Sequence, residues 1–149
     1  MCEILPLGER HLAQVVDIEA ATFSDPWSES AFRGEMENPR SRFLVAEEAG
    51  QVLGYLGMQL VLDEGYISNV AVAAPCRRQG IGAKLMAAAV GIARQEALSL
   101  LTLEVRVSNT AAIALYERYG FQALGRRRGF YRFPREDAYV MTLFLEGKR

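Results

Sequence analysis

The chain has 149 residues, of which 50% are hydrophobic and 23% are charged, the balance of an ordinary globular protein. This length fits one domain, residues 1–149, and leaves little room for a second. The formal net charge of −1 excludes a global basic field, so we expect no nucleic-acid partner.

The cysteine and histidine content limits the chemistry of the chain. Cys2, Cys76 and His11 are spread out without a CxxC pair, so they supply neither a zinc site nor a disulfide framework. We therefore expect a cytoplasmic, metal-free protein whose cysteines are buried rather than nucleophilic. The amino terminus lacks a basic start followed by an apolar run, and no stretch approaches ~18 apolar residues, so we expect no targeting signal and no membrane anchor.

The first half of the chain predicts a short edge strand, two helices and three further strands. The first helix starts near Glu9, carries Leu12, Val15, Val16 and Phe23 on one side, and ends at Asp25–Pro26. Ser28 can cap the second helix. The expected strands are residues 4–7, 43–46, 52–62 and 66–72, with a hairpin turn at 49–50.

The second half alternates strands and helices. Residues 82–95 form one predicted helix, and Asn109 can cap another that Gly120 closes. The expected strands are residues 101–107, 121–127 and 139–145. The order β-α-α-β-β-β-α-β-α-β-β favours an α/β fold with a mixed sheet and helices on both faces.

Residues 70–85 pass from an apolar strand, through arginines and glycines, into a helix. Gly80 and Gly82 let the backbone approach a ligand closely, and the free N–H groups of the helix start attract an anion together with Arg77 and Arg78. A dinucleotide fingerprint needs a third glycine, and a Walker A loop needs Lys-Ser/Thr directly after a glycine. Neither pattern is present, so the loop predicts an anion cradle of another kind.

Two polar side chains beyond this loop are candidates for the chemistry. Glu104 lies on the face of its strand opposite the apolar residues, and because two predicted helices flank that strand, we expect it to be central and this face to line a cleft. Most such glutamates are merely solvated. Tyr116 shares a helical stripe with Leu115 and Tyr119, so a core position is an equal alternative to a chemical role.

The spacing Arg77-x-x-Gly80-x-Gly82 resembles the pyrophosphate signature of the GCN5-related N-acetyltransferases (GNAT), and residues 108–121 match that family in order and spacing. The resemblance implies a mixed, mostly antiparallel sheet of about seven strands with helices on both faces. It also implies acetyl-coenzyme A as co-substrate, with no metal. The implied cofactor contacts are Val70, Ala71, Val72, Arg77, Arg78, Gln79, Gly80, Ile81, Gly82, Ala83 and Asn109.

Over almost its whole length the chain is similar to the RimI-type ribosomal-protein-alanine N-acetyltransferases, most closely in residues 103–117. In that family the glutamate matching Glu104 is the general base and the tyrosine matching Tyr116 is the general acid. The resemblance implies that the acceptor is the N-terminal alanine of the small-subunit ribosomal protein eighteen. The chain departs from the family mainly in residues 127–134, which we expect to form a loop before the last strand.

The chemistry independently favours an α-amine as acceptor. An α-amino group with a pKa of ~8 is about one-tenth neutral at pH 7, whereas a lysine at ~10.4 is neutral to only ~0.04%. Deprotonation therefore costs roughly 1.4 against 4.6 kcal/mol, and a carboxylate acting through water manages the first more easily. Since the sequence offers no Ser-His-Asp set and no Cys-His pair, we expect direct attack in a ternary complex.

We expect the acceptor to be recognised by loops that carry Trp27, Asp63, Glu64, Tyr131 and Asp137. The three acids would form a groove for an arginine-rich terminus, and the two aromatic rings would offer flat surfaces. The simpler alternative places the acids in turns and Trp27 in the core. Two other functions stay open: a GNAT enzyme that acts on a small amine or on lysine side chains, and a non-catalytic acyl-coenzyme A sensor.

Overall fold

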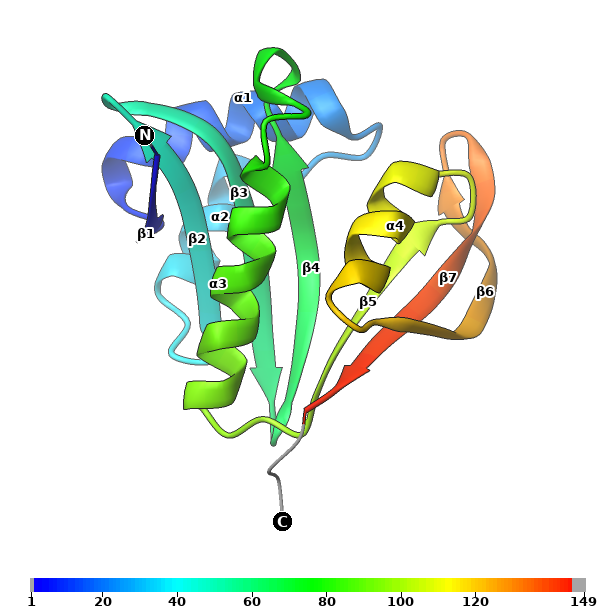
Figure 1. Ribbon diagram of the computed structural model, residues 1–149. Coiled ribbons are helices and arrows are strands. Elements are labelled where there is room, and N and C mark those ends of the chain that lie inside the picture. Colours follow the sequence, from blue (N-terminus) through cyan, green and yellow to red (C-terminus); the bar gives the residue numbers. More distant parts are fainter. Residues whose placement is uncertain (1, 146–149) are drawn as a thin grey trace.

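The computed structural model describes residues 2–145, and its elements follow the order expected from the sequence (Figure 1). Short 3-10 turns precede α1 and α3. The strands are β1 (Glu3–Pro6), β2 (Ser41–Glu48), β3 (Gln51–Val61), β4 (Glu64–Val72), β5 (Leu100–Arg106), β6 (Gln122–Arg132) and β7 (Arg135–Phe144). The helices are α1 (Leu12–Thr22), α2 (Glu29–Met36), α3 (Ile81–Gln95) and α4 (Thr110–Arg118).

The seven strands form one sheet in the order β1-β2-β3-β4-β5-β7-β6, and all neighbours are antiparallel except β4 and β5. The parallel pair joins only Glu64–Tyr66 to Leu100–Thr102. Beyond these three residue pairs the two strands diverge, which gives the sheet the V shape seen in Figure 1. The mixed, mostly antiparallel sheet expected from the resemblance is confirmed, and β5 is central.

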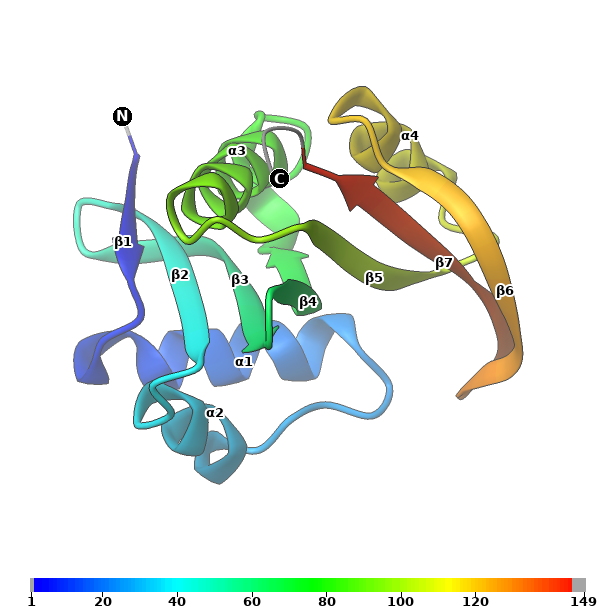
Figure 2. The same cartoon turned by 90° about the horizontal axis from the view of Figure 1, so that it is seen from below.

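The helices cover both faces of the sheet (Figure 2). Helices α1 and α2 pack on one face around Val15, Phe32 and Tyr55. Helices α3 and α4 pack on the other face, where the larger core includes residues of both arms of the V. Among residues 2–145 no helix has the length and apolar content that a membrane crossing requires.

Local sequence signals explain where the helices begin. The Ser28 hydroxyl accepts a hydrogen bond from the Ala31 amide at 3.1 Å, and the Asn109 side chain accepts one from the Ala112 amide at 3.2 Å. Both caps satisfy a backbone donor that the first helical turn leaves free, so both predicted starts are confirmed. The expected position of Phe23 is wrong, because this residue caps the end of α1 in an extended conformation and its side chain is 37% exposed.

The expected loop at residues 127–134 is also wrong. β6 continues to Arg132 and turns through Phe133–Pro134 directly into β7. The pairing shifts register between Arg127 and Tyr131, and Gly129 within this bulge has a φ of +59°. This segment is an edge strand with exposed charged residues, so it lacks the apolar alternation by which strands are recognised in a sequence.

Candidate active site

A pocket of about 750 Å³ opens where β4 and β5 diverge. β4 contributes residues 66–70 to its lining, and β5 contributes residues 103–106. The end of α1 with the loop after it, residues 22–27, forms a second side, and the β6–β7 hairpin, residues 130–134, forms a third. Asn109 and Tyr116 reach the pocket from α4 and its cap. Both catalytic candidates, Glu104 and Tyr116, therefore line one cavity, and the polar β5 face that holds Glu104 does border a cleft.

Glu104 is held by two side chains that the sequence analysis did not select. Tyr66 on β4 donates its hydroxyl proton to Glu104 Oε1 at 2.5 Å, and Arg127 Nε lies 3.2 Å from Oε2. The Glu104 side chain is only 10% exposed. The three residues come from three strands and meet only because of the sheet order, so no sequence spacing signals their contact. Each carboxylate oxygen has more than one acceptor site, and Glu104 can still accept a hydrogen bond from a pocket ligand.

Tyr116 shows features of both alternatives, a position in the core and a chemical role. Its ring is buried beside Phe121, with ring centroids 5.9 Å apart, and the residue is 7% exposed. Yet its hydroxyl has no hydrogen-bond partner within residues 2–145, and the residue borders the pocket. Burial, with a smaller contribution from Tyr131, raises the pKa of Tyr116 to about 12. The side chain is therefore protonated at neutral pH, and its hydroxyl is free to donate to a ligand.

The anion cradle predicted at the start of α3 has the required backbone geometry. Gly80 caps the helix with a φ of +80°, and a Cβ there would meet nothing within 4 Å. Arg78 also has a positive φ, of 66°, and Arg77 Nε donates to the carbonyl oxygen of Val72 at 3.0 Å. The first amides of α3 have no partner inside the helix, so they can face an anion.

This cradle continues toward the catalytic candidates along β4. No β5 residue pairs with β4 beyond Tyr66, so this edge of β4 is open between Ser68 and Val72. Val70 and Val72 pack on the face of α3 and α4, whereas the Ala71 side chain is buried on the opposite face. These residues fit an extended chain with an anionic end, such as acetyl-coenzyme A: the amides of α3 would hold the pyrophosphate, and the open edge of β4 would hold the pantetheine arm.

Of the five residues expected to recognise the acceptor, Tyr131 and Trp27 border the pocket. Tyr131 lines the pocket, and the guanidinium of Arg106 lies 4.3 Å from its ring centroid. Trp27 borders the pocket but packs its ring against Phe32 and Phe43, at centroid distances of 5.2 and 5.8 Å, so the core alternative describes its ring. The three acids do not line the pocket.

The acidic groove built from Asp63, Glu64 and Asp137 is therefore a wrong expectation. Glu64 pairs with Leu100 at the start of β5, whereas Asp137 bonds to Val107 just after the end of the same strand. The seven residue steps from Leu100 to Val107 span roughly 23 Å of strand. Asp137 also receives hydrogen bonds from Arg126 and from the Gly129 amide, which lower the pKa of its carboxyl. These acids lie in turns and in the hairpin, as the simpler alternative expects.

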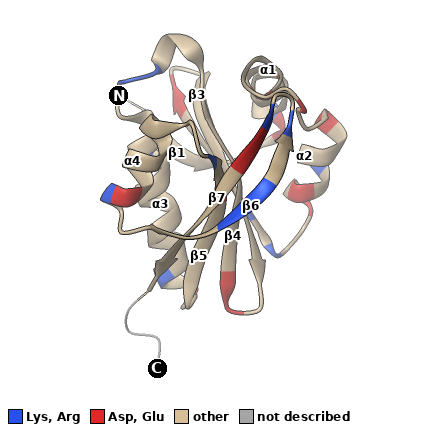
Figure 3. Cartoon of the chain, turned by 90° about the vertical axis from the view of Figure 1, so that its right-hand side faces the viewer, with Lys and Arg blue, Asp and Glu red and all other residues tan. Residues whose placement is uncertain are grey.

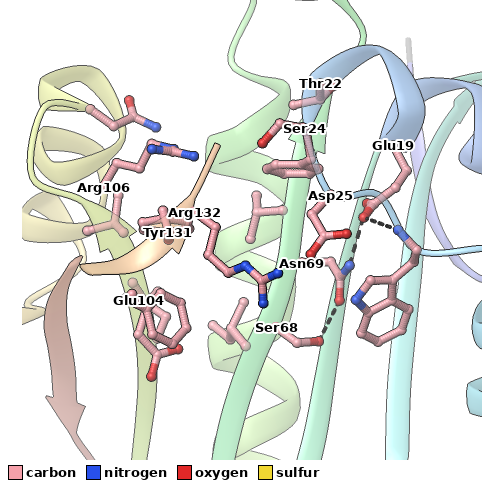
Figure 4. Close-up of a pocket in the computed structure, with 18 of the residues that line it drawn as sticks. Glu19, Thr22, Ser24, Asp25, Ser68, Asn69, Glu104, Arg106, Tyr131 and Arg132 are labelled. Atoms are coloured by element: carbon pink, nitrogen blue, oxygen red, sulfur yellow. Dashed lines mark hydrogen bonds between the residues drawn. The ribbon is translucent and has the colours of Figure 1, made fainter. Parts of the chain in front are cut away.

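A second buried carboxylate, Glu19, organises the wall opposite Glu104 (Figure 4). It is 2% exposed and accepts hydrogen bonds from the Trp27 amide at 2.9 Å, from the Asn69 side chain at 3.5 Å and from the Tyr55 hydroxyl. These bonds tie the loop after α1 to β3 and β4. The sequence gives one signal for this network, because a glutamate on the apolar side of an amphipathic helix needs buried partners.

Comparison with known proteins identifies the class. Residues 12–121 match the model of the acetyltransferase (GNAT) family. The alanine N-acetyltransferase of ribosomal protein bS18 from Escherichia coli is 35% identical over 145 residues, which cover 96% of this chain and 97% of that protein. A Bacillus subtilis protein, provisionally named for the same activity, is 39% identical over 132 residues, or 88% of this chain and 87% of that protein.

The fold agrees with this match. The crystal structure of the Escherichia coli ribosomal-protein-S18-alanine N-acetyltransferase superposes with a TM-score of 0.89 at 34% identity and covers 100% of this chain and 98% of that one. The chain belongs to the GNAT family of acetyltransferases. It is an N-acetyltransferase that uses acetyl-coenzyme A, and among its relatives are enzymes named as alanine N-acetyltransferases of the ribosomal protein bS18.

Proposed function

We propose that this enzyme acetylates the α-amine of an N-terminal alanine, and that its acceptor is the ribosomal protein bS18 for which its relatives are named. The observation that carries the proposal is the meeting of Glu104 and Tyr116 in one pocket at the divergence of β4 and β5. The pocket opens on the face of α1 and α2, while the cradle lies at the start of α3 on the other face. Donor and acceptor can thus enter from opposite faces.

In this proposal the two candidates handle the two protons of the reaction. Acetyl-coenzyme A supplies an activated acetyl group. Glu104 accepts the proton that the acceptor amine must lose, either directly or through one water, because a protonated amine has no lone pair for attack. Tyr116 holds a proton at its hydroxyl and donates it to the departing thiolate, and the second proton that the acceptor nitrogen loses as the amide forms restores the hydroxyl. Asn109 fixes the start of α4 by its cap and so fixes the position of Tyr116.

The same arrangement favours an α-amine over a lysine side chain. One partly paired carboxylate at the base position suits an amine that is already about one-tenth neutral at pH 7. A lysine acceptor needs roughly 3 kcal/mol more for deprotonation, and Glu104, the candidate base, already has Tyr66 and Arg127 as partners. A sensor that only binds acyl-coenzyme A needs neither the free hydroxyl of Tyr116 nor a carboxylate in the cavity.

The proposal is tested by initial-rate kinetics with acetyl-coenzyme A and a peptide carrying the first residues of bS18. We expect Glu104→Gln and Tyr116→Phe each to lower kcat by at least about tenfold, while the affinity for acetyl-coenzyme A stays within about twofold. Transfer to the alanine α-amine at an unchanged rate in both variants would remove the two residues from the chemistry. Binding of acetyl-coenzyme A without transfer to any amine would favour the sensor.

A further inference from the structure

Two arginines line the pocket, and one of them, Arg132, has no acidic partner within residues 2–145. Arg106 pairs with Glu136 at 3.0 Å, Arg127 pairs with Glu104 at 3.2 Å, and Arg126 pairs with Asp137 at 2.9 Å. Arg132, on the same hairpin, forms no hydrogen bond or ion pair within residues 2–145. Its guanidinium carbon lies over the Phe133 ring, 5.6 Å from the ring centroid.

Arg132 is exposed to solvent, and its side chain borders the cavity. It lines the pocket, and Figure 4 shows its guanidinium between the β5 side, where Glu104 lies, and the β4 side, where Ser68 and Asn69 lie. The preceding residue, Tyr131, lines the same pocket. Figure 3 shows the arginines of β6 on the hairpin that closes this side of the molecule. Arg132 therefore points at the space that an acceptor must fill.

An acceptor that fills this space would cover the guanidinium and remove its water. A charged group that loses its water without gaining a partner is costly, so a matching acceptor has to offer an anion or several carbonyl oxygens. A carboxylate fits best, because its two oxygens match the two parallel N–H groups of a guanidinium. Of the acidic residues that line the pocket, Glu19 and Glu104 already bind other protein groups. Asp25 is the remaining acidic residue of the lining that could pair with Arg132.

We propose that Arg132 is a specificity-determining residue that binds a side-chain carboxylate within the first residues after the acetylated amine. This inference rests on the proposed function, since it requires a peptide acceptor. A basic contact at Arg132 takes the place of the acidic groove expected from the sequence. The enzyme would then also acetylate acceptors that carry an acidic residue near the N-terminus, in addition to the ribosomal protein.

The test uses matched peptides that start with alanine and differ only in having glutamate or glutamine at the second or the third position. We expect the wild-type enzyme to acetylate the glutamate peptide at one of these positions with a kcat/KM about tenfold higher than its glutamine partner. In Arg132→Gln this ratio should fall to about one, with kcat/KM for the glutamine peptide nearly unchanged. Arg132→Lys should keep part of the ratio, because it retains the charge but loses the paired donors.

Two control variants separate the alternatives. Arg128→Gln removes the same charge from β6 outside the pocket lining and should leave the ratio intact. Asp25→Asn should also leave it intact, and a higher ratio in that variant would show an internal Asp25–Arg132 contact that competes with the peptide carboxylate, which would contradict a free Arg132. Equal rates for both wild-type peptides, or an equal loss for both peptides in Arg132→Gln, would overturn the inference. If none of the peptides is acetylated, the proposed function fails instead.

Discussion

Glu104 and Tyr116 differ in how their polar atoms are occupied. Both oxygens of Glu104 have protein partners, Tyr66 and Arg127, whereas the Tyr116 hydroxyl has none in residues 2–145. A carboxylate held at both oxygens has a fixed orientation and needs no rearrangement before it accepts a proton. We therefore assign Tyr66 a positioning role that acts through Glu104.

Tyr66→Phe removes the hydroxyl that holds Glu104 and keeps the ring. We expect kcat to fall by about three- to tenfold with little change in the affinity for acetyl-coenzyme A, because only the orientation of the base is affected. Tyr139→Phe is the matched control, since the Tyr139 hydroxyl forms no hydrogen bond with any of residues 2–145. Steady-state kinetics of the wild type and both variants give the three kcat values. Equal kcat for all three proteins would show that Tyr66 contributes only to packing.

The raised pKa of Tyr116 has a consequence for stability at high pH. This pKa is about 12 in the folded protein and about 10 in an unfolded chain. The unfolded state therefore loses its proton first, so the stability that depends on neutral Tyr116 is complete below pH 10 and is lost between pH 10 and 12. Between pH 9 and pH 11, Tyr116→Phe should lose about 1 kcal/mol less unfolding free energy than the wild type. Urea unfolding at both pH values measures this difference, and equal losses would show that Tyr116 ionises as easily when folded.

At the scale of elements, the start of α3 lies close to both β4 and α4. A Cβ on Gly82 would lie 3.3 Å from Leu115 Cδ2 and 3.9 Å from Val72 Cγ2. A larger residue there would push α4 away from α3 and narrow the approach to the cradle. Gly80 differs, because its surroundings are open and its positive φ makes any substitution strained through the backbone.

Gly82→Val should therefore weaken binding of coenzyme A by at least about tenfold, while the protein still folds. Gly91→Val is the matched control: it lies in the same helix, a Cβ there meets nothing within 4 Å, and we expect unchanged affinity. Titration calorimetry with coenzyme A gives both affinities. Unchanged affinity in a folded Gly82→Val variant would remove this turn from the cofactor site.

How well the sequence predicted each element depended on the strength of its pattern. β5 alternates buried Leu101, Leu103 and Val105 with half-buried polar residues, and it was predicted nearly to its bounds. β6 carries exposed arginines on an edge and was predicted to stop at residue 127, five residues short of its end. Contacts between strands leave no trace in the sequence, so it does not predict that Tyr66 and Arg127 hold Glu104.

At the scale of the whole molecule, the reaction site depends on the division of the sheet into two arms. β1–β4 form one arm and β5–β7 the other, and three residue pairs join them. The divergence places Glu104 and Tyr116 of the second arm opposite Tyr66 and Asn69 of the first. No local pattern predicts this opening, because it arises where two strands distant in sequence stop pairing. In the proposed function, the two substrates meet through this opening in the sheet.

The central claim, transfer to an α-amine in this opening, is tested most directly by locating the acetyl group on one peptide that offers both kinds of amine. A peptide with an N-terminal alanine and an internal lysine is incubated with acetyl-coenzyme A and the enzyme, and fragment-ion mass spectrometry locates the modification. We predict acetyl on the alanine α-amine alone in the wild type and at least about tenfold less product with Tyr116→Phe. Acetyl on the lysine, or equal product from both proteins, would contradict the account.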